Sequence, residues 1–563
     1  MKQYNVLKES WIPIRTLKGE YKKASPMDII NNGHTYAAIV DSNFQYVYGI
    51  LNFLRVIIMS AYKLKSLKDK ENLLGVGRFD TDIVQSYIDK CEKNRPNCFD
   101  LLDEKNPFYQ NPYAKLKLPK YSSETKNINL ETVFDGTYAF ETETMVGKVA
   151  VTRPAGNNTI HFHPDSYTFD GFNCEEATKA LLSVGFFQSN FDSSTNSASG
   201  PNGLEYPIYF VLKGKNLFDT IVLNLITEDT WNSCKAGLEY AENAAWEIDP
   251  EPFPKTPTSK VSLTEGLTFL NRSILLGPTN ENGEIEYINF HAGRLCDKSV
   301  DWRQLDGLYK YKYKGKKKEF LKVNPNTDMH SYTLLNSLVD KKAKDISVLT
   351  LKEAEKLFSS EILKRKGYSL NKIYYELYYI ALSRSTTGGY PQENMGVIEN
   401  YIPNILLDNE ECSDIFEGLI FSLTSLEDRI VKKLAEFLAR GRYADLGNSE
   451  KAKLKESVKD KIYNYYQTLD NILFSDFLMS ISNIEDSINI SDEFEVITNK
   501  FKVRLKDCLV NAASDLMNSN TSGMWIKIKG NKTYKYRFYP IYDEYIRIIN
   551  GICNEELKLS TIN

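Results

Sequence analysis

The spacing of apolar and polar residues changes along the chain and divides it into two parts. Up to residue 400, short alternating runs typical of strands are mixed with amphipathic stretches typical of helices. Beyond residue 401, long helical periodicity covers residues 411–441, 449–484, 492–518 and 534–557. Short links between four long helices favour an antiparallel bundle. The sequence therefore predicts an α+β protein, with a large mixed α/β domain over 1–400 and a C-terminal four-helix bundle over 401–563.

Local pattern and turn chemistry predict several elements of the first domain. WIPIR and the GEYKKA stretch after it predict two strands joined by a turn, and Ser25-Pro26 marks a helix start. Helical spacing covers 44–68, 175–189 and 370–383, whereas YPIYFVLKG and FDTIVLNLIT predict a strand followed by a helix. The aromatic, proline-broken residues 99–115 are expected to form a surface loop.

The most apolar early stretch, residues 37–62, predicts a buried helix rather than a membrane span. Asp41, Arg55 and three amide side chains interrupt it, and the N-terminal residues contain no apolar core of signal-peptide length. The eight cysteines are dispersed without a CxxC pair, which fits a reducing compartment and argues against zinc knuckles. A cytoplasmic protein without membrane contact is expected.

The overall charge balance limits how the chain could contact nucleic acid. Its 563 residues carry 70 basic and 74 acidic side chains, a net charge of −4. Proteins that coat nucleic acid by themselves are usually basic overall, so any such site must be a local patch. The 36 tyrosines and 28 phenylalanines make partner-facing surface plausible.

Two basic groups are candidates for phosphate contact. Residues 308–322, LYKYKYKGKKKEFLK, alternate Tyr and Lys and predict a β-hairpin with one basic face that turns at Lys314-Gly315. Further basic residues gather toward one end of the helix predicted at 411–441. The predicted phosphate contacts are Lys310, Lys312, Lys314, Arg429, Lys432 and Lys433. For charge runs alone, a solvated surface is the alternative interpretation.

The segment GNNTIHFHPD, residues 156–165, raises the question of a metal site. In a strand, His161, His163 and Asp165 would share one face, and two histidines with one carboxylate form a known ligand set. A metal-dependent nuclease or hydrolase built on these three residues therefore stays open as an alternative. The chain contains no HExxH, Walker A or nucleophile-elbow motif, so neither enzymatic activity nor a bound metal or cofactor is expected.

Seven motifs, taken in order, show a resemblance to a known family. They are ESWIPIR, NPFYQ, GNNTIHFH, the Ser- and Gly-containing loop 189–203, KGKNLFDTIVLNL, the proline-rich connector 246–259 and GGYPQEN. In this order they resemble the large subunit of the type I-E CRISPR surveillance complex, the CasA family of the complex called Cascade. The resemblance covers nearly the whole chain and extends to the C-terminal four-helix bundle.

The resemblance implies a non-catalytic DNA-recognition subunit. Such a subunit recognises the protospacer-adjacent motif (PAM) from the minor groove, helps to open the duplex for R-loop formation and helps to recruit a helicase-nuclease. The implied partners are double-stranded target DNA, guide CRISPR RNA, the helicase-nuclease, and the backbone, small and 5′-handle-binding subunits of Cascade. A purely architectural subunit, needed for assembly but not for DNA contact, is a further alternative.

The GNNTIHFH segment is similar to a family loop that reaches the 5′ end of the guide RNA and a neighbouring subunit. Amide groups and rings suit contacts with unpaired bases. The predicted contacts of this guide-RNA loop are Asn157, Asn158, His161, Phe162 and His163.

Residues 189–203 occupy the position of a glycine-rich family loop that lies against the PAM minor groove. The predicted contacts are Ser197, Ser199, Gly200, Asn202 and Gly203. Because only two glycines remain, contact is expected through backbone amides, and the PAM preference is expected to differ. The family also inserts a lysine into this groove, for which Arg294 and Lys298 are both candidates.

GGYPQEN is similar to the family hairpin that separates the first base pair next to the PAM. The residues that we name the predicted wedge are Gly388, Gly389, Tyr390, Gln392 and Asn394. In the family a glutamine leads this wedge, and here Gln392 and Asn394 are both candidates.

Overall fold

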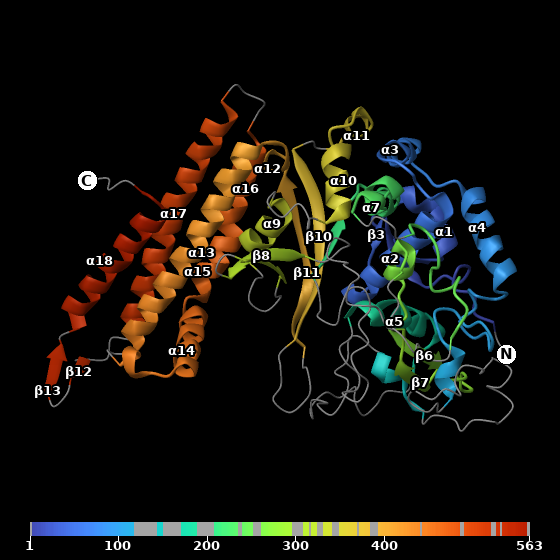
Figure 1. The fold of residues 1–563 in the computed structure, drawn as a ribbon, viewed down its shortest axis with the longest axis horizontal. Helices are drawn as coiled ribbons and strands as arrows, with labels where there is room; N and C mark the ends of the chain where they lie inside the picture. Colours follow the sequence, from blue (N-terminus) through green and yellow to red (C-terminus); the bar gives the residue numbers. More distant parts are fainter. Residues whose placement is uncertain are drawn as a thin grey trace. The chain divides into compact units, whose positions relative to one another are not determined.

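The computed structural model of the chain consists of two compact units (Figure 1). The first comprises Met1–Thr327 and Asp345–Tyr401, and the second comprises Asp328–Lys344 and Ile402–Asn563. Residues 330–340, the described part of the segment Asp328–Lys344, therefore pack with the C-terminal residues rather than with their neighbours in sequence. The structure describes residues 3–116, 143–149, 171–187, 208–234, 239–251, 260–294, 308–314, 317–323, 330–340, 348–368, 371–382, 392–439, 442–484, 489–519, 525–529, 532–536 and 538–559.

The first unit begins with a small antiparallel sheet. Strands β1 (Ile12–Thr16), β2 (Tyr21–Ala24) and β3 (Tyr36–Ile39) lie in the order β2-β1-β3. Helix α1 (Pro26–Asn32) begins after Ser25, whose hydroxyl oxygen accepts a hydrogen bond from the Asp28 amide at 3.0 Å. The two predicted strands and the Ser25-Pro26 helix start are confirmed.

Helix α2 (Phe44–Tyr62) forms the core of the first unit. It packs against α4 (Thr81–Asn94), α5 (Cys174–Phe187) and α8 (Leu263–Leu267). Among the described residues, α2 is the one helix long and apolar enough to cross a membrane, and 83% of its most apolar window is buried within the protein. The predicted buried helix is confirmed, but it ends at Tyr62, and α3 (Leu67–Val76) starts separately after a left-handed Lys63.

The prediction of a surface loop over residues 99–115 is wrong, because the aromatic side chains of this stretch enter the core. The Phe108 ring stacks on Trp246 with centroids 6.1 Å apart and meets the Phe53 ring edge-on at 5.4 Å. The Gln110 amide donates to the carbonyl of Leu101 at 2.8 Å, and its oxygen accepts from the Leu276 amide at 2.8 Å. The NPFYQ motif thus closes the core, since side-chain hydrogen bonds replace regular secondary structure there.

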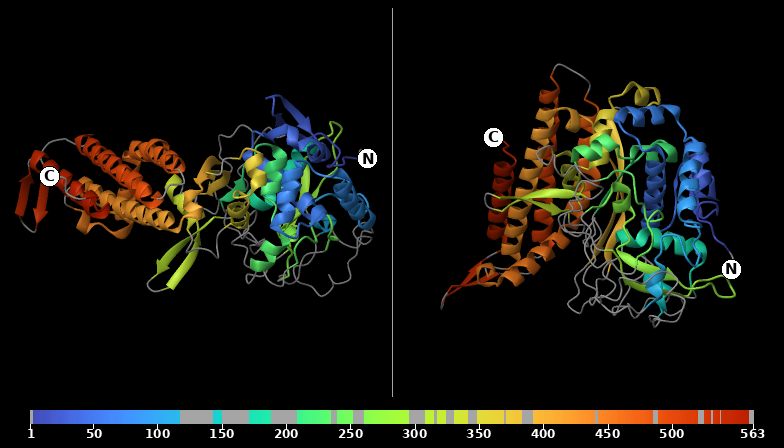
Figure 2. Two further views of the ribbon diagram at one scale, coloured as in Figure 1. Left: turned by 90° about the horizontal axis from the view of Figure 1, so that it is seen from above. Right: turned by 45° about the vertical axis from the view of Figure 1, so that its right-hand side comes forward.

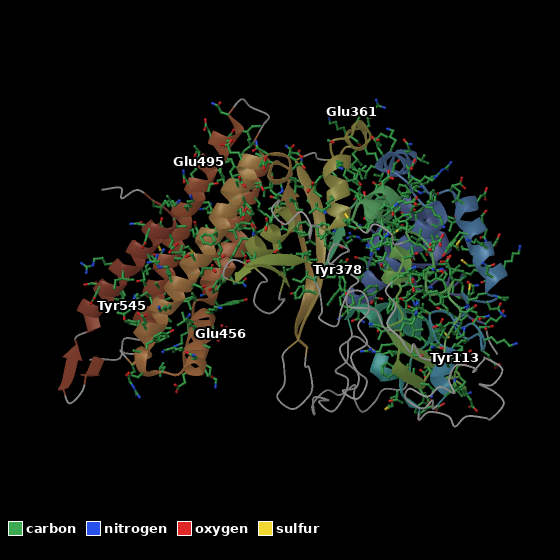
Figure 3. The ribbon with its side chains drawn as sticks, viewed as in Figure 1. Tyr113, Glu361, Tyr378, Glu456, Glu495 and Tyr545 are labelled. Atoms are coloured by element: carbon green, nitrogen blue, oxygen red, sulfur yellow. The ribbon has the colours of Figure 1, made fainter. Side chains whose placement is uncertain are left out.

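The predicted helix over 370–383 is also wrong, because this stretch forms strand β10 (Lys372–Leu382). Together with β5 (Tyr209–Leu212) and β11 (Gln392–Pro403) it makes a sheet in the order β11-β10-β5. Ile373, Tyr375 and Leu377 are buried at every second position, as expected for a strand with one face in the core. Tyr378 (Figure 3) packs against α2, with its ring 5.7 Å from that of Tyr48.

The described part of the first unit also contains a third sheet, a β-hairpin, several short helices and 3₁₀ turns. A third sheet contains β4 (Thr144–Met145), β7 (Tyr287–Ala292) and β6 (Arg272–Leu276), in that order. The predicted Tyr/Lys hairpin is confirmed as β8 (Tyr309–Lys314) and β9 (Lys317–Lys322). The short helices are α6 (Leu217–Leu223), α7 (Glu228–Cys234), α10 (Leu349–Leu357) and α11 (Glu361–Arg365), with 3₁₀ turns at Gly33–Thr35, Pro112–Lys115 and Val146–Val149.

The second unit is built mainly from helices. Helix α13 (Glu410–Leu438) packs against α9 (Ser331–Val339), α17 (Ile490–Ser519) and α18 (Phe538–Glu556). The helical stretch predicted at 449–484 is divided into α14 (Asn448–Lys461), α15 (Tyr463–Thr468), a π-helical turn (Leu469–Leu473) and α16 (Phe474–Ser482). The unit also contains the short helix α12 (Ile405–Asp408) and a 3₁₀ turn (Tyr443–Asp445).

The helix predicted over 534–557 begins later than expected. Residues 525–529 and 532–536 form an antiparallel hairpin, β12 (Trp525–Lys529) and β13 (Lys532–Tyr536), and α18 starts at Phe538. The alternating sequences WIKIK and KTYKY explain the difference, since period-two alternation with aromatic and β-branched residues favours strands. Figures 1 and 2 show the hairpin extending beyond the ends of α17 and α18.

Candidate nucleic-acid interface

Most residues predicted to contact nucleic acid lie outside the described residues. These are the guide-RNA loop (Asn157, Asn158, His161, Phe162, His163), the PAM loop (Ser197, Ser199, Gly200, Asn202, Gly203), Lys298, the wedge residues Gly388, Gly389 and Tyr390, and Asp165 of the alternative metal site. Lys310, Lys312, Lys314, Gln392 and Asn394 lie in described strands and are placed by their backbone alone. Side-chain geometry is therefore available for Arg294, Arg429, Lys432 and Lys433.

Arg294 is held in the first unit by the backbone that leads to it. Its amide donates to the Leu270 carbonyl at 2.8 Å, and the Gly293 amide donates to Asn271 at 3.1 Å. A Cβ added at Gly293 would lie 2.2 Å from the Leu270 oxygen, so this close approach of two chain segments requires glycine. The start of the segment that continues to Lys298 is thereby fixed in place.

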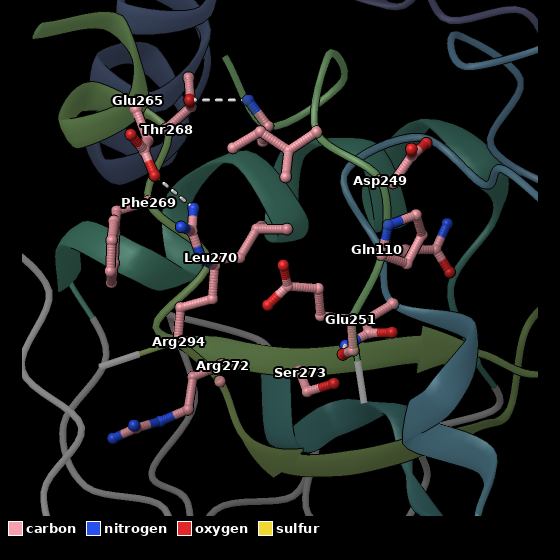
Figure 4. A pocket seen from close by; sticks show the side chains of 15 residues that line it. Gln110, Asp249, Glu251, Glu265, Thr268, Phe269, Leu270, Arg272, Ser273 and Arg294 are labelled. Carbon is pink, nitrogen blue, oxygen red and sulfur yellow. Dashed lines mark hydrogen bonds and ion pairs between the residues drawn. The ribbon is translucent and has the colours of Figure 1, made fainter. Parts of the chain in front are cut away.

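The Arg294 guanidinium is engaged by groups of the protein itself. Its Nη1 lies 2.5 Å from Oε1 of Glu265, and its Cζ lies 5.3 Å from the centroid of the Phe269 ring (Figure 4). The Glu265 side chain is only 6% exposed. Its other oxygen accepts from the Ser262 amide at 3.3 Å, completing a capping box at the start of α8. The positive charge of Arg294 is therefore balanced internally.

Beside Arg294 lies a small pocket of mixed polarity. Figure 4 shows Arg294 directed toward Glu265, whereas the Arg272 guanidinium extends away from that carboxylate. Asp249 and Glu251 also line the pocket. Three carboxylates around two guanidinium groups make the pocket poorly suited to a phosphate.

The predicted wedge is attached to a three-stranded sheet. Gln392 and Asn394 occupy alternate positions at the start of β11, which places them on the same strand face as Gly396. A Cβ at Gly396 would lie 3.1 Å from the Tyr379 hydroxyl, so the side chain of Tyr379 from the neighbouring strand β10 lies close over Gly396. Lys213, which directly follows β5, forms salt bridges with Glu376 of β10 at 2.9 Å and with Glu399 of β11 at 3.0 Å. The sheet therefore offers a braced support for the residues between β10 and β11.

The strand register separates the tyrosines and lysines of the β8–β9 hairpin. Cross-strand partners share a face, so Lys310, Lys312 and Lys314 lie on the same face as Leu321, Glu319 and Lys317. Tyr309, Tyr311 and Tyr313 lie on the opposite face with Lys322, Phe320 and Lys318. The register therefore places Lys318 and Lys322 of β9, rather than the lysines of β8, on the same face as the tyrosines of β8.

The three basic residues predicted on α13 have different surroundings. Arg429 is paired with Glu555 at 3.0 Å and with Glu556, both at the end of α18. Lys433 is paired with Glu436 at 2.7 Å. Lys432 is exposed and makes no ion pair within the part of the chain that the structure describes. Of the three, Lys432 has the charge most available to an external phosphate.

A buried polar cluster in the second unit was not found from the sequence. The carboxylate of Glu427 on α13 accepts hydrogen bonds from the hydroxyls of Tyr332 at 2.9 Å and Tyr465 at 3.2 Å. Burial raises the pKa of Glu427 to about 7, although the nearby His330 opposes the shift. These residues come from three separate elements, so no local spacing could have indicated the cluster.

His330, next to this cluster, anchors the segment before α9. Its Nδ1 lies 3.0 Å from Oδ2 of Asp470, whose other oxygen accepts from the Ser331 amide at 3.0 Å. The imidazole is stacked between the rings of Tyr332 and Tyr466, with centroids 5.3 and 4.8 Å away. Burial lowers the pKa of His330, but the hydrogen bond and charge of Asp470 outweigh it, and the net pKa is raised. Asp470 lies in the π-helical turn, which aims its side chain at this segment.

The similarity of this chain to known proteins covers nearly its whole length. The model of the family described as CRISPR-associated protein Cse1 matches residues 5–502. No curated protein matches the chain in sequence. Among solved structures, CasA from Thermus thermophilus is 15% identical, with a TM-score of 0.65 over 98% of this chain and 100% of that one.

Two further solved structures show the same fold. Thermobifida fusca Cse1 is 14% identical, with a TM-score of 0.66 over 99% of both chains. A chain of a CRISPR RNA-guided surveillance complex is also 14% identical, with a TM-score of 0.61 over 93% of this chain and 100% of that one. The fold is thus shared with proteins of very different sequence.

Proposed function

Because the chain belongs to the CRISPR-associated protein Cse1 family, we propose that it is the DNA-recognition subunit of a type I-E Cascade complex. In this role it recognises the PAM from the minor groove, helps to open the duplex for R-loop formation and helps to recruit the helicase-nuclease. It acts as a non-catalytic cytoplasmic component that also contacts the guide RNA and neighbouring subunits. The observation that carries the proposal is the agreement in family and fold over nearly the full length.

The proposed division of labour between the two units follows from their composition. The first unit contains the segments proposed for guide-RNA contact, PAM recognition and duplex opening, and the sheet β11-β10-β5 supports the wedge. The helices of the second unit, which we propose to form the four-helix bundle of the family, guide the DNA strands and contact other subunits. Sequence beyond the PAM would be recognised by base pairing with the guide, so short-range groove contacts suffice.

The geometry of Arg294 favours Lys298 as the minor-groove cation. The Arg294 charge is compensated by the buried Glu265, and withdrawing it into a groove would leave that carboxylate unpaired. Lys298 lies four residues further along, beyond the point where the backbone is pinned. In this proposal Arg294 positions the segment, and Lys298 contacts the DNA.

R-loop formation by the complex reconstituted with this chain tests the proposal. The double variant Gln392→Ala and Asn394→Ala is expected to form fewer R-loops on a PAM-containing duplex. Its assembly with the guide RNA should remain intact. A bubble duplex, already open next to the PAM, should restore R-loop formation to the double variant. An unchanged rate on the closed duplex would rule out the wedge assignment.

Elemental analysis of the purified chain tests the alternative of a metal-dependent hydrolase. Stoichiometric zinc or iron that is lost with His161→Ala would favour that alternative. The described residues contain no group of three His, Cys, Asp or Glu side chains placed to hold a metal ion.

A further inference from the structure

The β12–β13 hairpin carries the strongest local concentration of positive charge next to aromatic residues in the second unit. Residues 516–542 contain five basic side chains and no acidic one, in a chain whose net charge is −4. Four of the five, Lys527, Lys529, Lys532 and Lys535, lie in the two strands. The Cse1 family model ends at residue 502, so this hairpin lies beyond the matched residues.

The strand register gathers most of this chemistry on one face. Trp525 pairs with Tyr536, Lys527 with Tyr534, and Lys529 with Lys532. Because cross-strand partners share a face and alternate positions return to it, these six residues occupy the same face of the hairpin. Ile526, Ile528, Thr533 and Lys535 occupy the other. The first face therefore runs from an aromatic pair through a mixed pair to a pair of lysines.

The hairpin is rooted at one defined end of the helical unit. Near the end of α17, Ser514 forms a hydrogen bond with Tyr542 near the start of α18. One turn further along α18, the ring of Tyr545 (Figure 3) meets that of Phe437 near the end of α13, with centroids 5.3 Å apart. The hairpin therefore lies in the chain between two helix ends that are joined to each other, and these ends lie beside the end of α13, which Arg442 follows in sequence.

We propose that the face formed by Trp525, Lys527, Lys529, Lys532, Tyr534 and Tyr536 binds an unpaired segment of nucleic acid. The lysines neutralise successive phosphates, and the aromatic residues supply stacking platforms for bases. The face spans about 13 Å along β12, enough for two to three nucleotides. This site is independent of the proposed PAM loop, groove cation and wedge, and its binding can be measured with the chain alone.

The arrangement favours a single strand over other polyanions. A duplex keeps its bases stacked inside, so the aromatic pair would have no partner, whereas unpaired bases stack on Trp and Tyr irrespective of sequence. An acidic protein would use the lysines but not the rings. DNA and RNA share the chemistry that the face recognises, and the 2′-hydroxyl distinguishes them.

The test is fluorescence anisotropy of the full-length chain with a labelled 20-nucleotide oligo-dT, from 50 to 200 mM salt. The triple variant Lys527→Gln, Lys529→Gln and Lys532→Gln is expected to bind roughly tenfold more weakly. The slope of log K against log salt should fall by about 2. The matched control replaces three exposed lysines of the first unit, Lys8, Lys18 and Lys90, by glutamine and should leave both quantities unchanged.

A second variant separates stacking from charge. Trp525→Ala is expected to weaken oligo-dT binding about tenfold without changing the salt slope. Oligo-U of the same length then distinguishes RNA from DNA as the preferred strand. Far-ultraviolet circular dichroism and thermal unfolding of each variant show whether the fold is retained.

Three outcomes would overturn the proposal. Equal losses in the triple variant and in the Lys8, Lys18 and Lys90 control would mean that binding follows net charge alone. Competition by polyglutamate as effective as that by unlabelled oligo-dT would indicate a generic polyanion site. A Trp525→Ala variant that folds and binds like the unmodified chain would remove the stacking role.

Discussion

The Tyr332 hydroxyl donates a hydrogen bond of 2.9 Å to Glu427, and this contact joins α9 to the middle of α13 in the second unit. Its acceptor belongs to a buried carboxyl group whose pKa is raised by desolvation. His330 lies alongside, paired with Asp470, so the docking of the segment around α9 depends on Glu427 and His330, whose pKa values are both raised.

This cluster predicts that the second unit loses stability as pH rises toward 7. Burial raises the pKa of Glu427 from 4.5 to about 7, so the folded state binds more protons than the unfolded state between these values. The free energy of unfolding therefore falls with rising pH in that interval, by up to about 3 kcal/mol in total. His330, whose pKa is also raised, acts in the same direction as pH passes above its ordinary value.

Hydrogen exchange of the amides in α9, measured from pH 5 to 8 and corrected for intrinsic rates, checks this expectation. In Glu427→Gln the pH dependence should be much weaker, because the amide keeps hydrogen-bonding capacity but does not titrate. The control is Glu456→Gln on α14, an exposed glutamate (69%) whose substitution should leave the profile unchanged. Identical profiles for the unmodified chain and Glu427→Gln would contradict the assignment.

A second buried pair predicts a large loss of stability in the first unit. Lys70 of α3 and Glu353 of α10 lie 2.6 Å apart with exposures of 0% and 1%. Lys70 also donates to the carbonyls of Leu223 and Leu225, while Glu353 accepts from the amide and hydroxyl of Thr227. Lys70→Ala leaves a buried carboxylate without its cation and should cost about 3–5 kcal/mol of unfolding free energy.

Urea unfolding monitored by intrinsic fluorescence measures this cost. Lys68→Ala, in the same helix, removes the pair between the exposed Lys68 and Glu71 and should change the free energy of unfolding by less than about 1 kcal/mol. Joint replacement by Lys70→Met and Glu353→Leu should recover much of the loss, because no charge is then left buried. Equal effects of Lys70→Ala and Lys68→Ala would show that the pair contributes little.

The elements predicted correctly are those whose pattern is local. Ser25-Pro26, the apolar run of α2 and the Tyr/Lys alternation of β8 each carry their own signal in a few residues. The sequence predicts a helix over 370–383 because Tyr and Leu fit both periods, whereas pairing with β5, distant in sequence, makes this stretch a strand. NPFYQ looked like a surface loop because its burial depends on Trp246, contributed from more than a hundred residues away.

The candidate site shows the same limit of local signals. The family resemblance made Arg294 a candidate groove cation, and the basic end of the predicted helix made Arg429 a candidate phosphate contact. In the structure Glu265 balances the charge of Arg294, and Glu555 and Glu556 balance that of Arg429. The Glu427 cluster had no signal, since its members lie far apart along the chain. The order of the motifs along the sequence was enough to indicate the family. The partners of individual side chains could be identified only from the structure.

The internal pairing of Arg294 predicts separate consequences for the two candidate groove cations. Arg294→Ala leaves the buried Glu265 without its cation and should lower the free energy of unfolding by about 1–3 kcal/mol. Lys298→Ala should leave stability unchanged but weaken binding of the assembled complex to PAM-containing duplex about tenfold, as expected for one lost groove contact.

Thermal unfolding of the chain and filter binding of the assembled complex provide the two measurements. Lys18→Ala, an exposed lysine of the same unit, serves as the charge-matched control for both. The reverse pattern, with Arg294→Ala weakening DNA binding at full stability, would assign the groove contact to Arg294 instead.

The basic end of α13 predicts that Lys432 rather than Arg429 contacts phosphate. Lys432 is exposed without an ion pair among the described residues, whereas Arg429 faces two carboxylates of α18. Lys432→Ala in the assembled complex should therefore lower the slope of log K against log salt for target DNA by about 1, the value for one released counterion. Arg429→Ala should leave that slope unchanged and alter the unfolding free energy by less than about 1 kcal/mol, because its pairs are largely exposed. Filter binding between 50 and 200 mM salt measures the slopes, and a fall with Arg429→Ala but not with Lys432→Ala would mean that DNA displaces the two glutamates from Arg429.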